Sequence, residues 1–179
     1  MCIRDRPHGA LFIEVVDGSG NPLPSARIRF PVEAEVHSVN SESGMWMSTV
    51  LYAYDGTERY FQKGMEVEFE AFAPGFGHRR VTFEPSKRKK NLVRVELEPW
   101  TLAASPDATE PELRAVAAWS RWLEAAEAHQ SDPSVESART LNHVRSLTAT
   151  AARDWLDATG SADARQLCWM TGTAQLCGT

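Results

Sequence analysis

The chain has 179 residues, of which 42% are hydrophobic and 24% charged, and its formal net charge is −5. This apolar content is sufficient for a buried core, so we expect a folded chain of one or two domains. The mildly negative charge argues against a nucleic-acid-binding protein, which would present a basic surface. The sequence contains no uninterrupted apolar run of about 18 residues, so we predict no membrane span.

The first six residues look foreign to the rest of the chain. Residues 1–6 resemble the translation of a sequencing adapter. On this interpretation they are a non-native artefact, the chain is a metagenomic fragment, and its true start, with any signal peptide, has been lost. The alternative is an ordinary N-terminus. We leave these residues out of the fold prediction, as one does with a fusion scar.

Residues 7–100 are predicted to form an antiparallel β-sandwich. Their apolar residues alternate with polar ones in short runs, which is typical of strands with one buried and one solvated face. Clusters of glycine, proline and polar residues at 17–22 and 73–77 indicate turns between the strands. The alternating apolar positions are Leu11, Ile13, Val15, Ile28, Phe30, Val67, Phe69, Ala71, Val81, Phe83, Val93, Val95 and Leu97.

The composition changes after Trp100, and the rest of the chain is predicted to be helical. Residues 101–111 form a linker rich in alanine, serine, proline and threonine, and residues 112–179 a segment of two or three helices. Thr109 and Glu112 have the spacing of a capping box, in which each side chain binds the backbone N–H of the other residue. We therefore expect the first helix to begin there.

Start and stop signals place two further helices. Asp132 and Pro133 open the second helix, and Gly160 is a suitable stop because glycine adopts the left-handed conformation that ends many helices. A short third helix is expected over residues 161–170. Apolar residues at helical spacing predict the buried stripe of the first helix. These residues are Leu113, Val116, Trp119, Leu123 and Ala126.

No residue pattern identifies a catalytic, metal or cofactor site. None of the five histidines has the spacing of a helical zinc site, and the sequence has neither a nucleophile elbow nor a phosphate-binding loop. Glu66, Glu68 and Glu70 alternate along one strand and are expected to form a solubilising outer face rather than an acid–base pair. The sequence therefore predicts a protein that is not an enzyme and that binds no metal or cofactor.

Aromatic side chains are the candidate ligand-binding residues. Trp46 and Tyr54 are the two proposed platforms, because an exposed ring can stack on the apolar C–H face of a sugar. Strands also use aromatic residues for core packing, so both interpretations stay open. The aromatic residues of this region are Trp46, Tyr52, Tyr54, Tyr60, Phe61, Phe72 and Phe76.

Two cysteines remain once Cys2 is set aside with residues 1–6. Cys168 and Cys177 lie nine positions apart near the end of the chain. An even pair this close permits a disulfide, which would imply an oxidising compartment. The alternative is a pair of buried free thiols.

Part of the β half resembles a known family. Residues 12–17, followed by residues 20–28, resemble the opening of carboxypeptidase regulatory-like domains, with a D-x-x-G-x-P-L-x-x-A turn between two strands. Residues 43–46 and 73–76 are similar to two later elements of that family and occur in the same order. The resemblance covers residues 9–98, about half of the chain, and nothing in the helical half contributes to it.

The resemblance implies a transthyretin-like, Ig-like sandwich of seven strands. Such modules accompany metallocarboxypeptidases, adhesins and outer-membrane receptors without being catalytic, so we expect a secreted, periplasmic or cell-envelope protein. Three functions stay open. They are a binding or scaffolding module with a protein partner, a carbohydrate-binding module, and the regulatory appendage of a metallopeptidase whose catalytic domain lies upstream.

Overall fold

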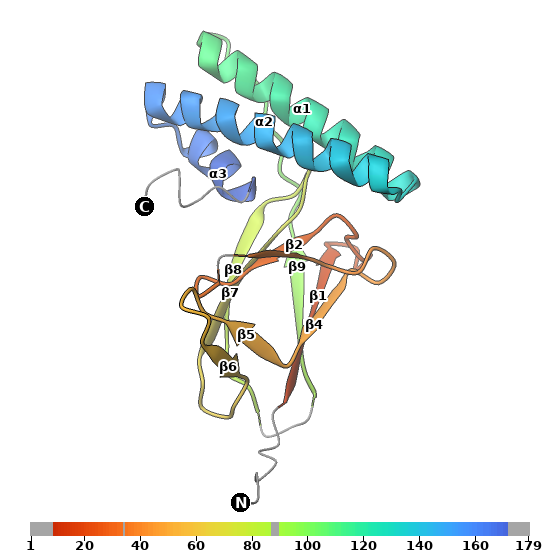
Figure 1. The fold of residues 1–179 in the computed structure, drawn as a ribbon. Coiled ribbons are helices and arrows are strands. Elements are labelled where there is room, and N and C mark those ends of the chain that lie inside the picture. Colours follow the sequence, from red (N-terminus) through yellow and green to blue (C-terminus); the bar gives the residue numbers. More distant parts are fainter. Residues whose placement is uncertain (1–8, 34, 87–89, 172–179) are drawn as a thin grey trace, which may run out of the picture. The chain divides into compact units, whose positions relative to one another are not determined.

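The computed structural model describes residues 9–33, 35–86 and 90–171. These residues form nine strands in three sheets and three helices, so the fold is mixed β plus α (Figure 1). The chain divides into two compact units. The first runs to Ala71 and resumes over Arg79–Leu97, and the second comprises Phe72–His78 and the chain from Glu98 onward. Residues 1–6, interpreted above as an artefact, lie outside the described residues.

The strands that open and close the first unit pair with each other. A three-stranded sheet has the order β4 (Met45–Ser48), β1 (Ala10–Asp17), β9 (Lys90–Leu97). β1 is antiparallel to β4 but parallel to β9. The prediction of a purely antiparallel fold is wrong at this pair. Alternation of apolar residues looks the same in both orientations, and the long intervening chain lets β9 return in the direction of β1.

The remaining six strands form two further sheets. The four-stranded sheet has the order β3-β2-β7-β8, and β5 pairs antiparallel with β6. The predicted count of seven strands is exceeded because β5 and β6 form a sheet of their own, with three residues in each strand. The bounds are β2 (Arg27–Arg29), β3 (Val36–Ser38), β5 (Val50–Tyr52), β6 (Glu58–Tyr60), β7 (Val67–Phe72) and β8 (His78–Phe83).

Most of the predicted inward-facing residues form the core of the first unit, whereas Val81, Phe83 and Val93 are half buried. Phe69, in the middle of β7, is fully buried, which confirms the phase predicted for that strand. The Phe30 ring, which follows β2, lies 5.8 Å from the Phe69 ring and 5.1 Å from the Trp46 ring on β4. Residues of the two larger sheets therefore meet in one core.

Asp17 closes the turn after β1 with its side chain. Its Oδ1 atom accepts hydrogen bonds from the backbone N–H groups of Ser19 and Asn21, each at 2.8 Å. The Asn21 side-chain amide, followed by these backbone donors, holds the pKa of Asp17 below its usual value. The segment is the tight turn that its glycines and prolines predict.

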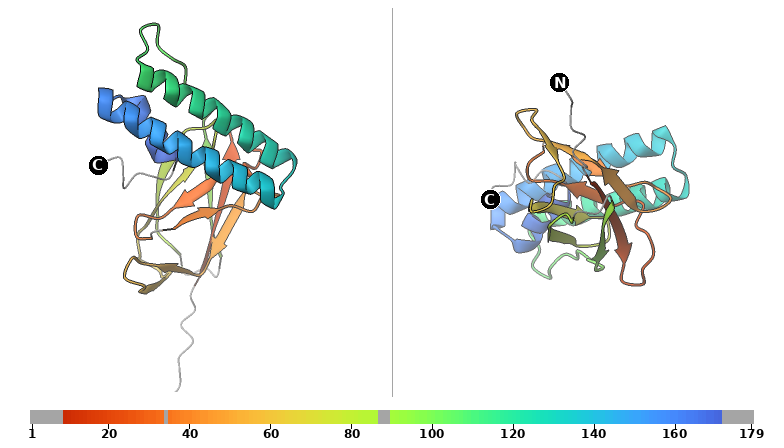
Figure 2. Two further views of the ribbon diagram at one scale, coloured as in Figure 1. Left: turned by 45° about the horizontal axis from the view of Figure 1, so that its top comes forward. Right: turned by 90° about the horizontal axis from the view of Figure 1, so that it is seen from below.

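The second unit contains the three predicted helices, α1 (Glu110–Ser131), α2 (Val135–Thr159) and α3 (Ala162–Met170). α1 and α2 lie side by side along their length (Figure 2). Gly160 ends α2 with a φ of 66°, as predicted from its position. Within the described part of the chain, no helix is both long enough and apolar enough to cross a membrane.

The capping box lies on α2 and not on α1. Thr109 is the N-cap residue of α1, as expected, but its side chain makes no capping bond, and the Glu112 carboxylate accepts the backbone N–H of Ser105 at 2.8 Å. The predicted Thr109–Glu112 box is therefore wrong, because the linker before α1 supplies a competing donor. At α2, the side chains of Ser134 and Ser137 each accept the backbone N–H of the other residue.

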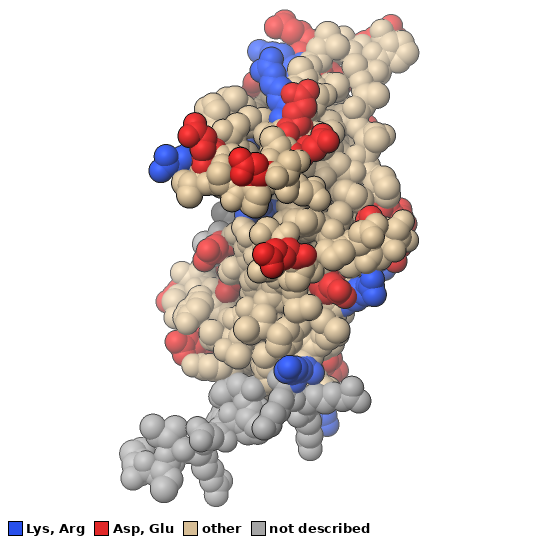
Figure 3. Space-filling view, turned by 90° about the vertical axis from the view of Figure 1, so that its right-hand side faces the viewer, with Lys and Arg blue, Asp and Glu red and all other residues tan. Residues whose placement is uncertain are grey.

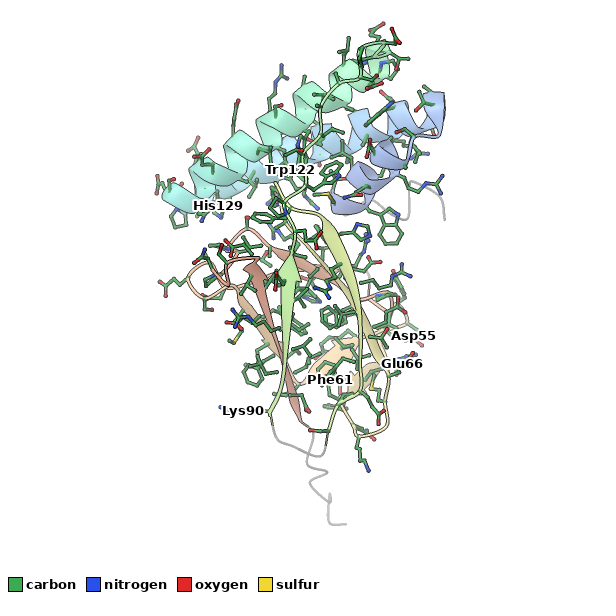
Figure 4. The ribbon with its side chains drawn as sticks, turned by 180° about the vertical axis from the view of Figure 1, so that it is seen from behind. Asp55, Phe61, Glu66, Lys90, Trp122 and His129 are labelled. Carbon is green, nitrogen blue, oxygen red and sulfur yellow. The ribbon has the colours of Figure 1, made fainter. Side chains whose placement is uncertain are left out.

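Tryptophan rings fill the interior of the second unit. Trp119 lies edge-on to Trp100 and to Trp122, with ring centroids 5.0 and 5.4 Å apart, and Figure 4 shows Trp122 among the helices. The predicted stripe of α1 is correct at Trp119 and Ala126, which are buried, but wrong at Leu113, which is 51% exposed. The helix is rotated toward its larger indole rings, which bury more apolar surface than leucine.

The turn at Phe72–His78 belongs to the second unit. Its Gly77 N–H donates to the Glu98 carbonyl at 2.8 Å, and the Trp100 N–H donates to the Gly75 carbonyl at 3.0 Å. These bonds join the turn to the segment that leads into α1. Residues far apart in sequence thus form one unit with the helices.

Candidate functional site

The structure places the two predicted platform residues in different environments. Trp46 is half buried on β4, and its ring lies 5.1 Å from Phe30 and 5.2 Å from His37. This placement favours the core-packing interpretation for Trp46. Tyr54 lies in the turn between β5 and β6 and is 59% exposed.

The β5–β6 hairpin carries further aromatic and polar side chains on one face. Tyr52 pairs with Glu58, and Val50 pairs with Tyr60, across the two strands. Directly paired residues of antiparallel strands point to the same side, as do residues two apart. Tyr52, Glu58 and Tyr60 therefore share one face of the hairpin, which we call the tyrosine face.

Buried residues fix this hairpin to the first unit. Leu51 points to the opposite face from Tyr52 and is 1% exposed, and Phe61, directly after β6, is equally buried. Figure 4 shows Phe61 inside the unit and Asp55 at the hairpin turn. These two apolar anchors, one on β5 and one just after β6, hold one side of the hairpin inward, so the tyrosine face is directed outward.

A buried carboxylate positions Tyr52 through its backbone. Glu33 is 5% exposed, and its Oε1 atom accepts the Tyr52 N–H at 2.6 Å. Its Oε2 atom lies 2.6 Å from His37 Nε2, on β3. Both carboxylate oxygens thus have partners, as burial requires. Glu33 therefore joins β3 to β5.

The tyrosine face borders a hollow of about 430 Å³. Glu58 accepts a hydrogen bond from the Tyr60 hydroxyl, and this bond, followed by the charge of Glu58, raises the pKa of Tyr60. Side chains with hydrogen-bonding groups dominate the lining, together with one thioether and a glycine. The lining residues are Glu58, Arg59, Tyr60, Gln62, Lys63, Gly64 and Met65.

Glu70 departs from its predicted position on a solvated face. It is 2% exposed and lies between Arg29 and Arg80, on the two strands that flank β7. Arg29 Nε donates to its Oε2 at 3.0 Å, and Arg80 Nη2 donates to its Oε1 at 2.9 Å. The prediction of a solubilising glutamate face is wrong at Glu70, because neighbouring strands supply the counter-charges.

No metal-binding cluster appears where the structure can be described. In residues 9–33, 35–86 and 90–171, no three His, Cys, Asp or Glu side chains are placed to hold an ion. Cys168 is fully buried on α3, and its predicted partner Cys177 lies outside the described residues. The disulfide between them stays a prediction.

Charged side chains are scattered over the face of the molecule in Figure 3. Acidic groups are spread over this face with a few basic groups among them, and no continuous basic surface gathers on its described part. Nucleic-acid-binding proteins neutralise phosphates with clustered lysine and arginine. This face lacks that arrangement.

Sequence reasoning named Tyr52 and Tyr60 among the aromatic residues but gave them no role. The signal that could have joined them is Asp55–Gly56, a pair typical of tight hairpin turns. The Asp55 side chain accepts the Thr57 N–H at 2.9 Å, and Gly56 has a φ of 80°. A hairpin centred there brings Tyr52 and Tyr60 onto one face.

A comparison with protein-family models finds no match to this chain, and a comparison with curated proteins finds no match either. The function is therefore inferred from the chain's own geometry.

Proposed function

We propose that this chain is a non-catalytic module that binds carbohydrate through the tyrosine face. The observation that carries the proposal is that Tyr52, 54% exposed, shares a hairpin face with Glu58 and Tyr60, which line the adjoining hollow. A pyranose presents an apolar C–H face and a rim of hydroxyls. It needs a ring to stack on and polar groups around that ring, and this surface offers both.

Other side chains of the hollow suit sugar hydroxyls. Glu58 is an acceptor, Arg59 and Lys63 are donors, and the Gln62 amide is both. The exposed Tyr54 lies two residues beyond Tyr52, in the turn between β5 and β6. This proposal keeps Tyr54 as a ligand-binding residue and assigns Trp46 to packing.

We also propose that the first unit is a transthyretin-like sandwich of the carboxypeptidase-regulatory-like kind. Its two larger sheets have three and four strands, seven together, in addition to the β5–β6 pair. The contact of Phe30 with Trp46 supports packing of one sheet on the other. The side-chain-closed turn at Asp17 supports the resemblance in the first element.

A secreted, periplasmic or cell-envelope location belongs to the same proposal. Its support is the placement of Cys168, buried on the last helix and nine residues before Cys177. A bond between these cysteines requires an oxidising compartment.

The test is affinity electrophoresis of the full chain in gels that contain soluble neutral polysaccharides such as xylan or β-glucan. We expect at least one polysaccharide to retard the protein. Tyr52→Ala should weaken that binding about tenfold, because stacking and buried area are lost together. Tyr52→Phe keeps the ring face and should retain most of the affinity.

The matched control is Leu92→Ala, which removes another exposed apolar side chain, from β9 of the three-stranded sheet. It should leave retardation unchanged. The proposal is overturned if no neutral polysaccharide retards the chain, or if Tyr52→Ala and Leu92→Ala behave alike.

A further inference from the structure

A pocket of about 450 Å³ lies on the second unit, where α2 ends and α3 begins. One face of α3 forms much of its wall, because the lining positions recur along that helix at spacings of three and four residues. The volume falls within the range of about 300–1,000 Å³ that is usual for small-molecule sites. The lining residues are His78, Gly160, Ala162, Arg165, Gln166 and Trp169.

Two flat rings stand in this lining. The His78 and Trp169 ring centroids are 6.0 Å apart, and their planes differ by 20°. His78 is exposed and Trp169 half buried, so part of this aromatic surface is accessible to solvent. A ligand with a flat apolar face complements it.

The lining also carries a positive charge. Arg165 is exposed and lies one helical turn before Trp169 on the same face of α3. None of the described lining residues is acidic, and Asp163, in the first turn of α3, is not among them. A guanidinium in this setting suits a carboxylate, whose two oxygens match its parallel donors.

Gln166 adds a neutral polar group. Its Nε2 atom lies 3.8 Å from the position that a Cβ atom on Gly77 would occupy, so the amide packs beside the glycine backbone. The amide can donate to or accept from ring substituents. The pocket therefore combines an aromatic surface, a cation and an amide within two turns of one short helix.

We infer that this pocket binds a small molecule in which a carboxylate is attached to a six-membered ring. Arg165 binds the carboxylate, Trp169 packs against the ring, and Gln166 hydrogen-bonds its substituents. Acidic sugars and aromatic acids share this chemistry. The inference goes beyond the proposed carbohydrate function, because the pocket shares no residue with the tyrosine face and selects for charge.

The test uses the full chain in ligand-observed NMR titrations with three probes: glucuronate, glucose and benzoate. The carboxylate probes should bind at least about tenfold more tightly than glucose, because only they form a charge-assisted bond to Arg165. Tighter binding of glucuronate assigns an acidic sugar, and tighter binding of benzoate assigns an aromatic acid.

Three variants locate the binding. Arg165→Gln should reduce carboxylate affinity about tenfold or more, to the level of glucose. Ala162→Phe should abolish binding by filling the pocket from an exposed position at the start of α3. Arg121→Gln, which removes an exposed arginine from α1, is the matched control and should change nothing. Thermal melts should show all three variants folded.

Three results overturn the inference. One is the absence of carboxylate binding up to about 10 mM, which corresponds to a very weak site. Another is equal affinity for glucuronate and glucose. The last is unchanged affinity in Arg165→Gln. Tyr52→Ala separates the two proposals, since it should weaken polysaccharide binding and leave glucuronate binding intact.

Discussion

At the scale of single residues, Glu70 illustrates what a local pattern cannot reveal. Its place in an alternating row of glutamates predicts exposure, yet Arg29, 41 residues earlier, meets it across the sheet. Arg29 has 13% of its side chain exposed, so neither partner is fully hydrated. A buried carboxylate is tolerated only where such partners satisfy it. The sequence shows that both residues are present but not that they lie close together in the fold.

Replacing Glu70 with glutamine should destabilise the first unit by about 3 kcal/mol, because it removes the carboxylate charge that pairs with the largely buried Arg29. Arg80 is 56% exposed and can turn to Glu68, so its loss adds little. Urea unfolding measures the difference. Glu66→Gln changes an exposed glutamate and should stay within about 0.5 kcal/mol of the parent. Equal effects of the two substitutions would contradict the buried-pair account.

Tyr60 provides a pH-dependent signature of the tyrosine face. Its pKa is raised because Glu58 accepts the hydrogen bond of the protonated hydroxyl and repels the phenolate. Because the pKa of Tyr60 is higher in the folded chain than in the unfolded chain, the Tyr60–Glu58 hydrogen bond stabilises the fold fully at pH values below the unfolded-state pKa. This stabilisation is lost as the pH rises through the folded-state pKa.

Glu58→Gln should lower the pKa of Tyr60 toward its ordinary value, because the acceptor charge is removed. Phenolate absorbance of the folded protein measures the titration. The step that disappears in Tyr60→Phe is the titration of Tyr60 among the three tyrosines. An unchanged titration curve in Glu58→Gln would show that the bond does not form in solution.

At the scale of elements, the sequence predicts those features of strands and helices that depend only on residues close by in the chain. The inward phase of β7 at Phe69 and the stop of α2 at Gly160 both follow from local signals, and both are correct. The direction of β9 beside β1 depends on distant segments and was missed. The start of α1 at Thr109 was predicted correctly, but its capping bonds were not, since Ser105 competes for the Glu112 carboxylate. The β5–β6 hairpin was too short for alternation to detect.

The two helix starts provide a matched pair of substitutions. Ser134→Ala should cost about 1 kcal/mol, because the Ser134 hydroxyl accepts the Ser137 N–H at the start of α2. Thr109→Ala should cost much less, since the Thr109 side chain makes no capping bond at α1. Thermal or urea unfolding of the second unit compares them. A larger cost at Thr109 would reverse the assignment of the caps.

At the scale of the whole molecule, a disulfide between Cys168 and Cys177 would both stabilise the chain and require an oxidising compartment. A bond between them closes a short loop and should contribute roughly 2.5–3 kcal/mol in the chain-entropy model. Thiol titration tests whether the bond forms. The protein is denatured but not reduced, lacks Cys2, and is made in an oxidising compartment. No titratable thiol and a gain of about two daltons on reduction are expected. Two titratable thiols would remove the main support for secretion.

The parallel pairing of β1 with β9 determines how the first unit responds to tension along the chain. The ladder joins eight residue pairs, from Ala10 beside Lys90 to Asp17 beside Leu97. Force entering at Ala10 and leaving at Leu97 therefore pulls the two strands lengthwise past each other from opposite ends. All the hydrogen bonds between them bear the load together. An antiparallel pair pulled from the same end would instead open one bond at a time, so this arrangement makes the first unit mechanically resistant.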